Sequence, residues 1–418
     1  MERFGFIALG FWPISDSTLI LILKWILILA IVTASVVSIA LESINLSYTS
    51  SKKDTLPGIL RAHFNRDFQD NAYKYLKAKT YLSMISDFWY CILSVTILQF
   101  ALLGLLDGYI RSFNWGQYIT GVVFFLFFSF IFLLSEIPFR LFRTFVIEQR
   151  FGFNKSTFRL WIVDFFKELC LSLIIGLPLL LMLFFFVDSA GRYWWFFSFL
   201  FLSCIQLFLA FVYPVWIAPL FNKFSPMEEG TLKSAIEELA HNLNFDLAGI
   251  YIMDGSRRSS HANAFFVGFG KYRRVVLFDT LVEQLSVDEL LGVLAHEIGH
   301  AKLNHVKKSM VVSFLISLIG FWFFSLIVSW PPLSQAFGFK IQSFYGMLTA
   351  CLFLLSPLSL FLAPLSSLFS RHFEYEADAF AVKASSTPSA FEKALIKISE
   401  KSLSNLNPHP LYSFFYYS

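Results

Sequence analysis

The chain has 418 residues, of which 56% are hydrophobic and 15% are charged, and its formal net charge is +4. Soluble domains carry roughly 25% charged residues, so this composition excludes an ordinary soluble protein and predicts one embedded in a lipid bilayer. No block of basic residues is interleaved with aromatic residues, which argues against a nucleic-acid partner. The four cysteines lie far apart in apolar runs and resemble small hydrophobic residues more than disulfides or metal ligands: Cys91, Cys170, Cys204 and Cys351.

Seven apolar runs are long enough to form membrane-spanning helices, because a span needs about 20 apolar residues. The first run has no obvious small-residue cleavage site, so we expect it to stay in the protein as a membrane helix. The runs cover residues 19–41, 86–106, 118–135, 168–187, 194–217, 309–330 and 345–369.

Lysine and arginine are concentrated in the loops after the first and third runs, whereas the alternate loops hold only Arg111, Arg192 and Lys340. Because positively charged loops stay in the cytosol, this pattern places the N-terminus outside. It also places residues 222–308 and the tail 370–418 on the cytosolic side.

Residues 222–308 form the longest polar stretch, and their patterns predict a small α/β unit. Residues 228–243 have helical periodicity, and residues 250–253, 264–269 and 274–278 are typical of short strands. Ser286 followed by Glu289 predicts a capping box at the start of a helix that runs to about His305.

This last helix carries His296-Glu297-Ile298-Gly299-His300, an H-E-x-x-H motif. Histidines four positions apart share one face of a helix, so both imidazoles can reach one zinc ion. The glutamate beside them can take a proton from a zinc-bound water. The motif therefore predicts one Zn²⁺ per chain, with His296 and His300 as ligands and Glu297 as the catalytic base.

A catalytic zinc site usually has a third protein ligand, and Glu374 is the best candidate. It follows the seventh run, and two spans separate it from the motif, so it returns to the same membrane face. Asp378 lies one helical turn later and can hold the second nitrogen of a ligand imidazole. We expect Glu376 to point away from this face into solvent.

Three further histidines are weaker candidates. His305 should be turned off the metal face, and His372 would be a ligand only in a different register. His261 begins a run through Phe266 that is equally consistent with an ordinary strand and with an edge strand that pairs with a peptide substrate. The group that stabilises the oxyanion stays open between Arg371, Asp378 and a residue of the tail.

Taken together, these residues resemble the type I CAAX prenyl proteases, integral-membrane zinc endopeptidases of the endoplasmic reticulum and of bacterial membranes. The resemblance extends over nearly the whole chain and includes the E-x-x-x-D pattern of Glu374 and Asp378. It also includes the segments 145–155, 218–223, 261–264 and 276–280. Family members continue after a Tyr-Ser like Tyr417-Ser418 with a His-Pro whose histidine lies near the zinc. This sequence stops at Ser418, and His409 does not match that position.

The resemblance implies a mainly α, polytopic membrane protein whose seven helices surround a water-filled chamber, with a small cytosolic α/β zinc-protease unit. It implies cleavage after the prenylated cysteine of a C-a-a-X tail, Asp378 as a catalytic residue, and Asn263 and Arg371 as residues that hold the substrate backbone. The expected partners are a peptide or protein substrate and the lipid bilayer, and we expect a monomer. The host membrane is either the endoplasmic reticulum or a bacterial inner membrane.

We therefore expect four parts: five spans with cytosolic loops (1–221), the α/β unit (222–308), spans six and seven (309–369) and a cytosolic tail (370–418). Two other protease types are alternatives: a bacterial quality-control zinc protease of the heat-shock type, and a site-2 type protease, which the polar flanks of the motif disfavour. A channel or transporter would need charges within the spans, and we expect little there beyond Lys24.

Overall fold

The computed structural model describes residues 15–417 except residues 53–55, 57, 269–272 and 385–387. Within the described residues, seven helices are long and apolar enough to cross a membrane. Many of their large apolar side chains are exposed, which fits a surface that faces lipid. The prediction of a mainly α, polytopic membrane protein is confirmed.

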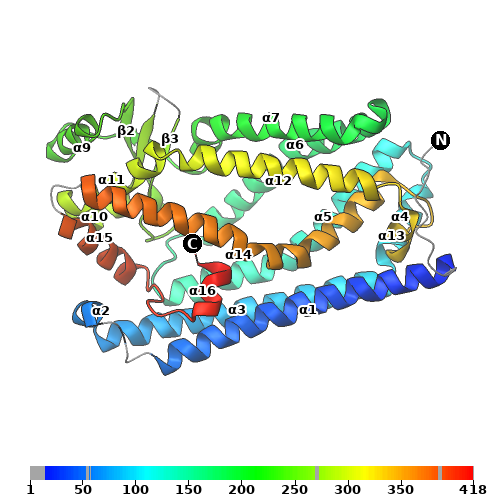
Figure 1. The fold of residues 1–418 in the computed structure, drawn as a ribbon, viewed down its shortest axis with the longest axis horizontal. Helices are drawn as coiled ribbons and strands as arrows, with labels where there is room; N and C mark the ends of the chain where they lie inside the picture. Colours follow the sequence, from blue (N-terminus) through cyan, green and yellow to red (C-terminus); the bar gives the residue numbers. More distant parts are fainter. Residues whose placement is uncertain (1–14, 53–55, 57, 269–272, 385–387, 418) are drawn as a thin grey trace.

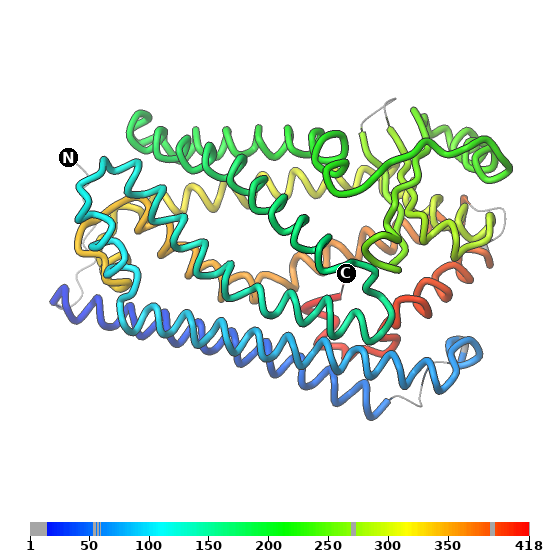
Figure 2. Tube along the Cα trace, turned by 180° about the vertical axis from the view of Figure 1, so that it is seen from behind, coloured from blue at the N-terminus to red at the C-terminus, as the bar shows by residue number. Residues whose placement is uncertain are grey.

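The long helices run side by side along the molecule (Figures 1 and 2). The first two, α1 and α3, form one antiparallel layer, and α6, α7 and α12 lie on the opposite side of the molecule. Between these layers, α5 and α14 cross the interior. The bounds are α1 (Asp16–Ser51), α3 (Arg66–Gln99), α5 (Gln117–Phe142), α6 (Phe158–Ser189), α7 (Trp194–Val212), α12 (His305–Ile327) and α14 (Phe344–Ala384).

Most of these helices are longer than the apolar runs that predict them. The second span differs most, because α3 begins at Arg66 and so includes Lys74, Lys77 and Lys79, which we expected in a loop. It ends at Gln99 and not at residue 106, since Ala101 adopts a left-handed conformation with φ 52° and the chain turns into α4 (Leu102–Arg111). The helical hydrogen bonding of α3 therefore continues through polar residues that precede its apolar part.

The two short helices α4 and α13 (Pro331–Ala336) lie at the end of the molecule away from the sheet (Figure 1). Their segments meet at two glycines: a Cβ on Gly104 would lie 1.9 Å from the carbonyl oxygen of Gly338. Gly338 itself has φ 87°, a left-handed conformation that favours glycine. Only residues without a side chain allow this close backbone contact.

The opposite end carries a four-stranded sheet with the order β1-β2-β4-β3. The strands are β1 (Phe224–Pro226), β2 (Gly249–Met253), β3 (Ala264–Val267) and β4 (Arg274–Phe278), and only the β2–β4 pair is parallel. The three expected strands are present, and Phe269, the expected end of the second, lies outside the described residues. The helices of this end are α9 (Thr231–Asn242), α10 (Asp279–Gln284), α11 (Val287–Lys302) and α15 (Pro388–Lys401).

The sheet region is tied to the membrane helices by hydrogen bonds and a partly buried ion pair. Arg258 donates to both oxygens of Asp164 in α6, at 2.8 and 3.1 Å, and to Asn222 Oδ1 at 2.9 Å. Beside it, Asn154 and Ser259 form an isolated antiparallel β-bridge. The π-helical segment η1 (Arg143–Glu148) continues α5 toward this bridge. These contacts fix the position of the sheet relative to the spans.

The remaining short elements complete the chain order. Helix α2 (Gly58–His63) joins α1 to α3, and the helical segments η2 (Gly191–Tyr193), η3 (Tyr213–Ile217) and α8 (Ala218–Phe221) flank or continue α7. The short segment η4 (Gly255–Arg257) precedes β3, and α16 (Pro410–Tyr416) lies near the end of the chain.

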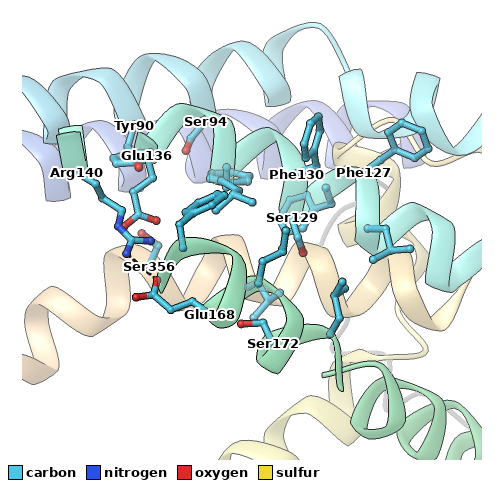
Figure 3. A pocket seen from close by; sticks show the side chains of 18 of the residues that line it. Tyr90, Ser94, Phe127, Ser129, Phe130, Glu136, Arg140, Glu168, Ser172 and Ser356 are labelled. Carbon is cyan, nitrogen blue, oxygen red and sulfur yellow. Dashed lines mark hydrogen bonds and ion pairs between the residues drawn. The ribbon is translucent and has the colours of Figure 1, made fainter. Parts of the chain in front are cut away.

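Helices α3, α5, α6 and α14 line a cavity of about 940 Å³ (Figure 3). Its wall is mainly phenylalanine and leucine, but Glu136, Arg140 and Glu168 also face it. Arg140 and Glu168 form an ion pair of 2.7 Å. The expectation of little intramembrane charge beyond Lys24 is therefore wrong. Glu168 lies at the start of the expected run 168–187, and α5 continues past residue 135 to include Glu136 and Arg140.

Candidate metal centre and active site

Helix α11 begins with the expected capping box. The main-chain N–H of Ser286 donates to the Glu289 carboxylate at 2.8 Å, and the Ser286 side chain caps the first turn in return. Glu289 is buried and also forms an ion pair of 2.7 Å with Lys397 of α15. Burial raises the pKa of Glu289, but the hydrogen bonds and charge of Lys397 and Ser286 outweigh burial and hold it below the usual value. The start of α11 is thus fixed to α15.

The same helix ends at Lys302 and not at His305. Asn304 adopts a left-handed conformation with φ 57°, which asparagine tolerates better than most residues. A new helix, α12, then starts at His305. This break changes the direction of the chain immediately after the H-E-x-x-H motif.

His296, His300 and Glu374 come together as the sequence predicts. His296 Nε2 lies 3.1 Å from His300 Nε2, and the Glu374 carboxylate lies 3.4 Å from His296 Nε2 and 3.7 Å from His300 Nε2. Helix α14 carries Glu374 and packs closely on α11 at Gly299, where a Cβ would lie 3.3 Å from Ala377 Cα. Small residues at this contact bring the two helices close enough for their ligands to meet.

This donor set fits a metal ion. Ligand atoms at about 2.0–2.2 Å from a tetrahedral ion are roughly 3.3 Å apart, close to the three separations observed here. Among the described residues, these three form the one His/Cys/Asp/Glu group compact enough to hold a metal ion. Two imidazoles and one carboxylate suit zinc, with a fourth position left for water.

Asp378 lies beside the other ring nitrogen of His296. Its Oδ1 atom is 2.9 Å from His296 Nδ1, although the two groups are close without the alignment of an ideal hydrogen bond. The His296 ring also stacks on Phe391 of α15 at 5.7 Å. Burial lowers the pKa of His296, but the nearby carboxylates, Asp378 first among them, outweigh burial and raise it. The Asp378 carboxylate therefore lies directly beside the outer nitrogen of the His296 ring.

His300 has a different neighbour, His305, and this contact corrects two expectations. His300 Nδ1 lies 3.0 Å from His305 Nδ1, and His305 Nε2 lies 3.0 Å from Glu376 Oε2. His305 is therefore not turned away from the site, and Glu376 is not a purely solvated residue. On an unbroken helix, a residue five positions on lies about 140° around the axis. The left-handed turn at Asn304, which no sequence pattern showed, brings His305 back to His300.

His372 is not a ligand in the structure. Its side chain is 67% exposed, and its Nε2 atom lies 3.6 Å from Glu376 Oε1. It thus contacts the same carboxylate as His305 from the solvent side.

Glu297 lies between the two histidines on α11 and is largely buried. Burial, reinforced by the charge of Glu374 and partly opposed by His296, raises its pKa to about 7. Burial, together with the neighbouring imidazoles His296 and His305, lowers the pKa of His300 to about 4. The His300 imidazole is therefore neutral near neutral pH, as a metal ligand must be.

His261, in the segment before β3, is in contact through both its ring and its main-chain carbonyl. The His261 ring stacks on Phe153 at 4.4 Å and lies 3.6 Å from Glu148 Oε2, and the His261 carbonyl accepts a hydrogen bond of 3.0 Å from Thr280. Asn263 Oδ1 accepts from the N–H of Ala264 at 2.8 Å, and Asn263 Nδ2 has no partner among the described residues. Strand β3 pairs with β4 on one side, is an edge of the described sheet, and packs against α11.

Arg371 uses its guanidinium within the chain. Nη1 donates to the main-chain carbonyl of Ser413 and, at 3.1 Å, to that of Tyr417. Ser413 lies in the middle of α16, and Tyr417 directly follows its last residue. In this structure Arg371 therefore fixes the C-terminal helix.

Two family models match the chain. Residues 45–223 match the five-membrane-helix N-terminal region of CAAX prenyl proteases, and residues 226–413 match peptidase family M48. A CAAX prenyl protease 1 homolog of Oryza sativa is 40% identical over 286 residues, which cover 68% of this chain and 67% of that protein. The homolog of Homo sapiens is 34% identical over 324 residues, 68% of each chain.

A solved structure is also similar. The crystal structure of S. mikatae Ste24p matches with a TM-score of 0.89 and 31% identity, over 94% of this chain and 96% of that chain. These matches confirm the resemblance noted from the sequence. The chain belongs to peptidase family M48, and it is a multi-pass membrane metalloendopeptidase that resembles the type I CAAX prenyl proteases.

Proposed function

We propose that this metalloendopeptidase is zinc-dependent, with His296, His300 and Glu374 as the metal ligands and Glu297 as the catalytic base. The observation that carries this proposal is the convergence of two imidazole nitrogens and one carboxylate from α11 and α14. When bound there, zinc would lower the pKa of a water molecule and polarise the scissile carbonyl.

The residues of the chain then have separate roles. Glu297 accepts a proton from the attacking water and delivers it to the leaving amine as the C–N bond breaks. Asp378 holds the His296 ring. The free amide nitrogen of Asn263 donates to a main-chain carbonyl of the substrate, which pairs with the edge of β3 as an added strand.

The proposed substrate is a prenylated protein C-terminus, because the curated relatives described above are named CAAX prenyl protease 1 homologs. The relatives named above are plant and animal proteins, which favours the endoplasmic reticulum over a bacterial inner membrane. We propose a cytosolic catalytic site, since the positively charged loops lie at the sheet end of the molecule. The protein acts as a monomer, with residues 222–308 and 370–418 forming the cytosolic parts.

Two variants test the chemistry. We expect Glu297→Gln to bind zinc like the wild type but to lose cleavage by about 10²–10⁴-fold or more, because it removes only the base. We expect Glu374→Ala to lose zinc. The measurements are zinc content by elemental analysis and cleavage of a prenylated C-terminal reporter peptide by the purified full-length protein.

The same peptide without its lipid separates substrate class from chemistry. Wild-type cleavage of both peptides at equal rates would contradict the prenylated substrate but not the protease. Undiminished cleavage by Glu297→Gln would contradict the catalytic role of Glu297, and stoichiometric zinc in Glu374→Ala would reject Glu374 as a ligand.

A further inference from the structure

The two ligand histidines are supported in different ways. The first, His296, has a carboxylate, Asp378, at 2.9 Å from its outer nitrogen. The second, His300, faces another imidazole, His305, at 3.0 Å, and a carboxylate, Glu376, stands behind that imidazole at 3.0 Å. Resting on the metal-ligand role proposed for His300, we propose that His305 and Glu376 are positioning residues. They form a carboxylate–imidazole–imidazole chain that fixes the ring orientation and the tautomer of His300.

The hydrogen-bonding capacity of each group determines the direction of this chain. An ionised carboxylate only accepts hydrogen bonds, so His305 Nε2 carries the hydrogen that points to Glu376. In a neutral imidazole the other nitrogen is then an acceptor, so His305 Nδ1 accepts from His300 Nδ1. The lone pair of His300 is thereby placed on Nε2, the atom that faces His296 and Glu374. This is the tautomer that a metal ligand at Nε2 requires.

The middle imidazole is almost completely removed from solvent. His305 is 3% exposed, and its ring stacks on Phe373 at 4.4 Å with an interplanar angle of 13°. A buried imidazole without partners would be costly, and both of its nitrogens are used here. The stacking fixes the plane of the His305 ring. In this plane one ring nitrogen faces His300 and the other faces Glu376.

Glu376 is the outermost member of this hydrogen-bonded series and lies near the protein surface. Lys308 Nζ and His372 Nε2 each lie 3.6 Å from its carboxylate oxygens. Glu376 is two residues from Glu374 on α14, and His305 is the first residue of α12. The hydrogen bond between His305 and Glu376 therefore joins the beginning of the sixth span to the helix that carries the third ligand.

Three substitutions separate positioning from simple packing. His305→Phe keeps an aromatic ring for the stack on Phe373 but removes both nitrogens. His305→Asn returns an oxygen acceptor close to the position of Nδ1. His372→Phe is the matched control, because it removes another histidine that contacts the same carboxylate but not His300.

The zinc dissociation constant of the purified full-length protein, measured by chelator competition, is the readout. We expect His305→Phe to raise it by about 10–100-fold, the usual effect of removing a residue that orients a metal-ligating histidine. His305→Asn should recover part of this loss, and His372→Phe should match the wild type. A ring that served only for packing would give the opposite order, with Phe tolerated better than Asn.

Wild-type zinc affinity in His305→Phe would overturn the proposal, and so would an equal loss in His372→Phe. If His305→Phe does not fold, Glu376→Gln provides the test, since it keeps the size of the side chain and removes the charged acceptor. We expect a loss near the lower end of the same range, and no loss would overturn the proposal. A wild-type protein that binds no zinc contradicts the proposed function and this inference together, whereas normal wild-type binding with unaltered variants contradicts only the inference.

Discussion

Arg371 shows how one residue of the site region can serve the structure of a distant segment. It lies one turn before Glu374 on α14, and its Nη1 atom donates to the carbonyls of Ser413 and Tyr417. Nearby, Ser367 donates to the carbonyl of Phe415 at 2.8 Å. The helix that carries Glu374 thus binds the main chain of α16 at several points.

Arg371→Ala should release α16 from α14. Hydrogen bonds from a charged donor contribute about 1.5–3 kcal/mol, so amide exchange in residues 410–416 should become at least about tenfold faster. Hydrogen–deuterium exchange of the purified protein measures this, with Lys383→Ala, an exposed position on the same helix, as the control. Unchanged exchange in Arg371→Ala would show that the other contacts alone hold α16.

The sequence predicted those side-chain contacts of the site that depend only on helical spacing and on the number of spans. His296 and His300 share a face because they are four residues apart, and the paired spans return Glu374 to them. The contacts of His305 and Glu376 could not be predicted, because they depend on a left-handed turn at Asn304. A single backbone conformation after the motif decided which side chains touch His300.

Among the elements, α11 depends on the support of its first turn. The Glu289 carboxylate accepts from Ser286 and pairs with Lys397 of α15 while itself being buried. Loss of this group affects both the start of the catalytic helix and its attachment to α15.

Glu289→Gln should destabilise the start of α11 by about 1–2 kcal/mol at pH 7. The folded-state pKa of Glu289 is lowered, so its contribution is present above the ordinary value of 4.5 and is lost as the pH falls through the lowered value. The difference between variant and wild type should therefore shrink in acid.

The measurement is thermal unfolding in detergent at neutral and acidic pH. Asp288→Asn is the control, because Asp288 occupies the same helical turn but is exposed. An equal effect at both pH values would mean that the ionised form of Glu289 does not supply the stability.

The elements also show the limits of hydropathy. All seven spans could be predicted from apolar runs, because a bilayer requires a minimum apolar length. Their ends could not, since α3 and α14 continue as polar helices beyond the apolar segment. The polar extension of α14 carries Glu374 and Asp378. The expected end of the seventh span, at residue 369, was therefore too early in the region that contains the candidate site.

For the whole molecule, the main prediction concerns its orientation in the membrane. The sheet and α11 lie at one end of the spans, and α4 and α13 lie at the other (Figure 1). If positively charged loops are cytosolic, Glu228→Cys near the sheet and Ser112→Cys after α4 should face opposite compartments.

A membrane-impermeant maleimide added to sealed, right-side-out endoplasmic reticulum vesicles measures this in a variant whose four native cysteines are serine. We expect labelling of Cys at position 228 without permeabilisation and labelling at position 112 only after it. The reverse pattern would place the metal site on the other side of the membrane.

The separation of the ligands along the chain has a consequence for biosynthesis. His296 and His300 precede the sixth span, whereas Glu374 is part of the helix that forms the seventh. A ribosome therefore finishes the H-E-x-x-H helix well before it makes the carboxylate that completes the donor set. A nascent chain can therefore bring the three proposed ligands together only after its last span has been made.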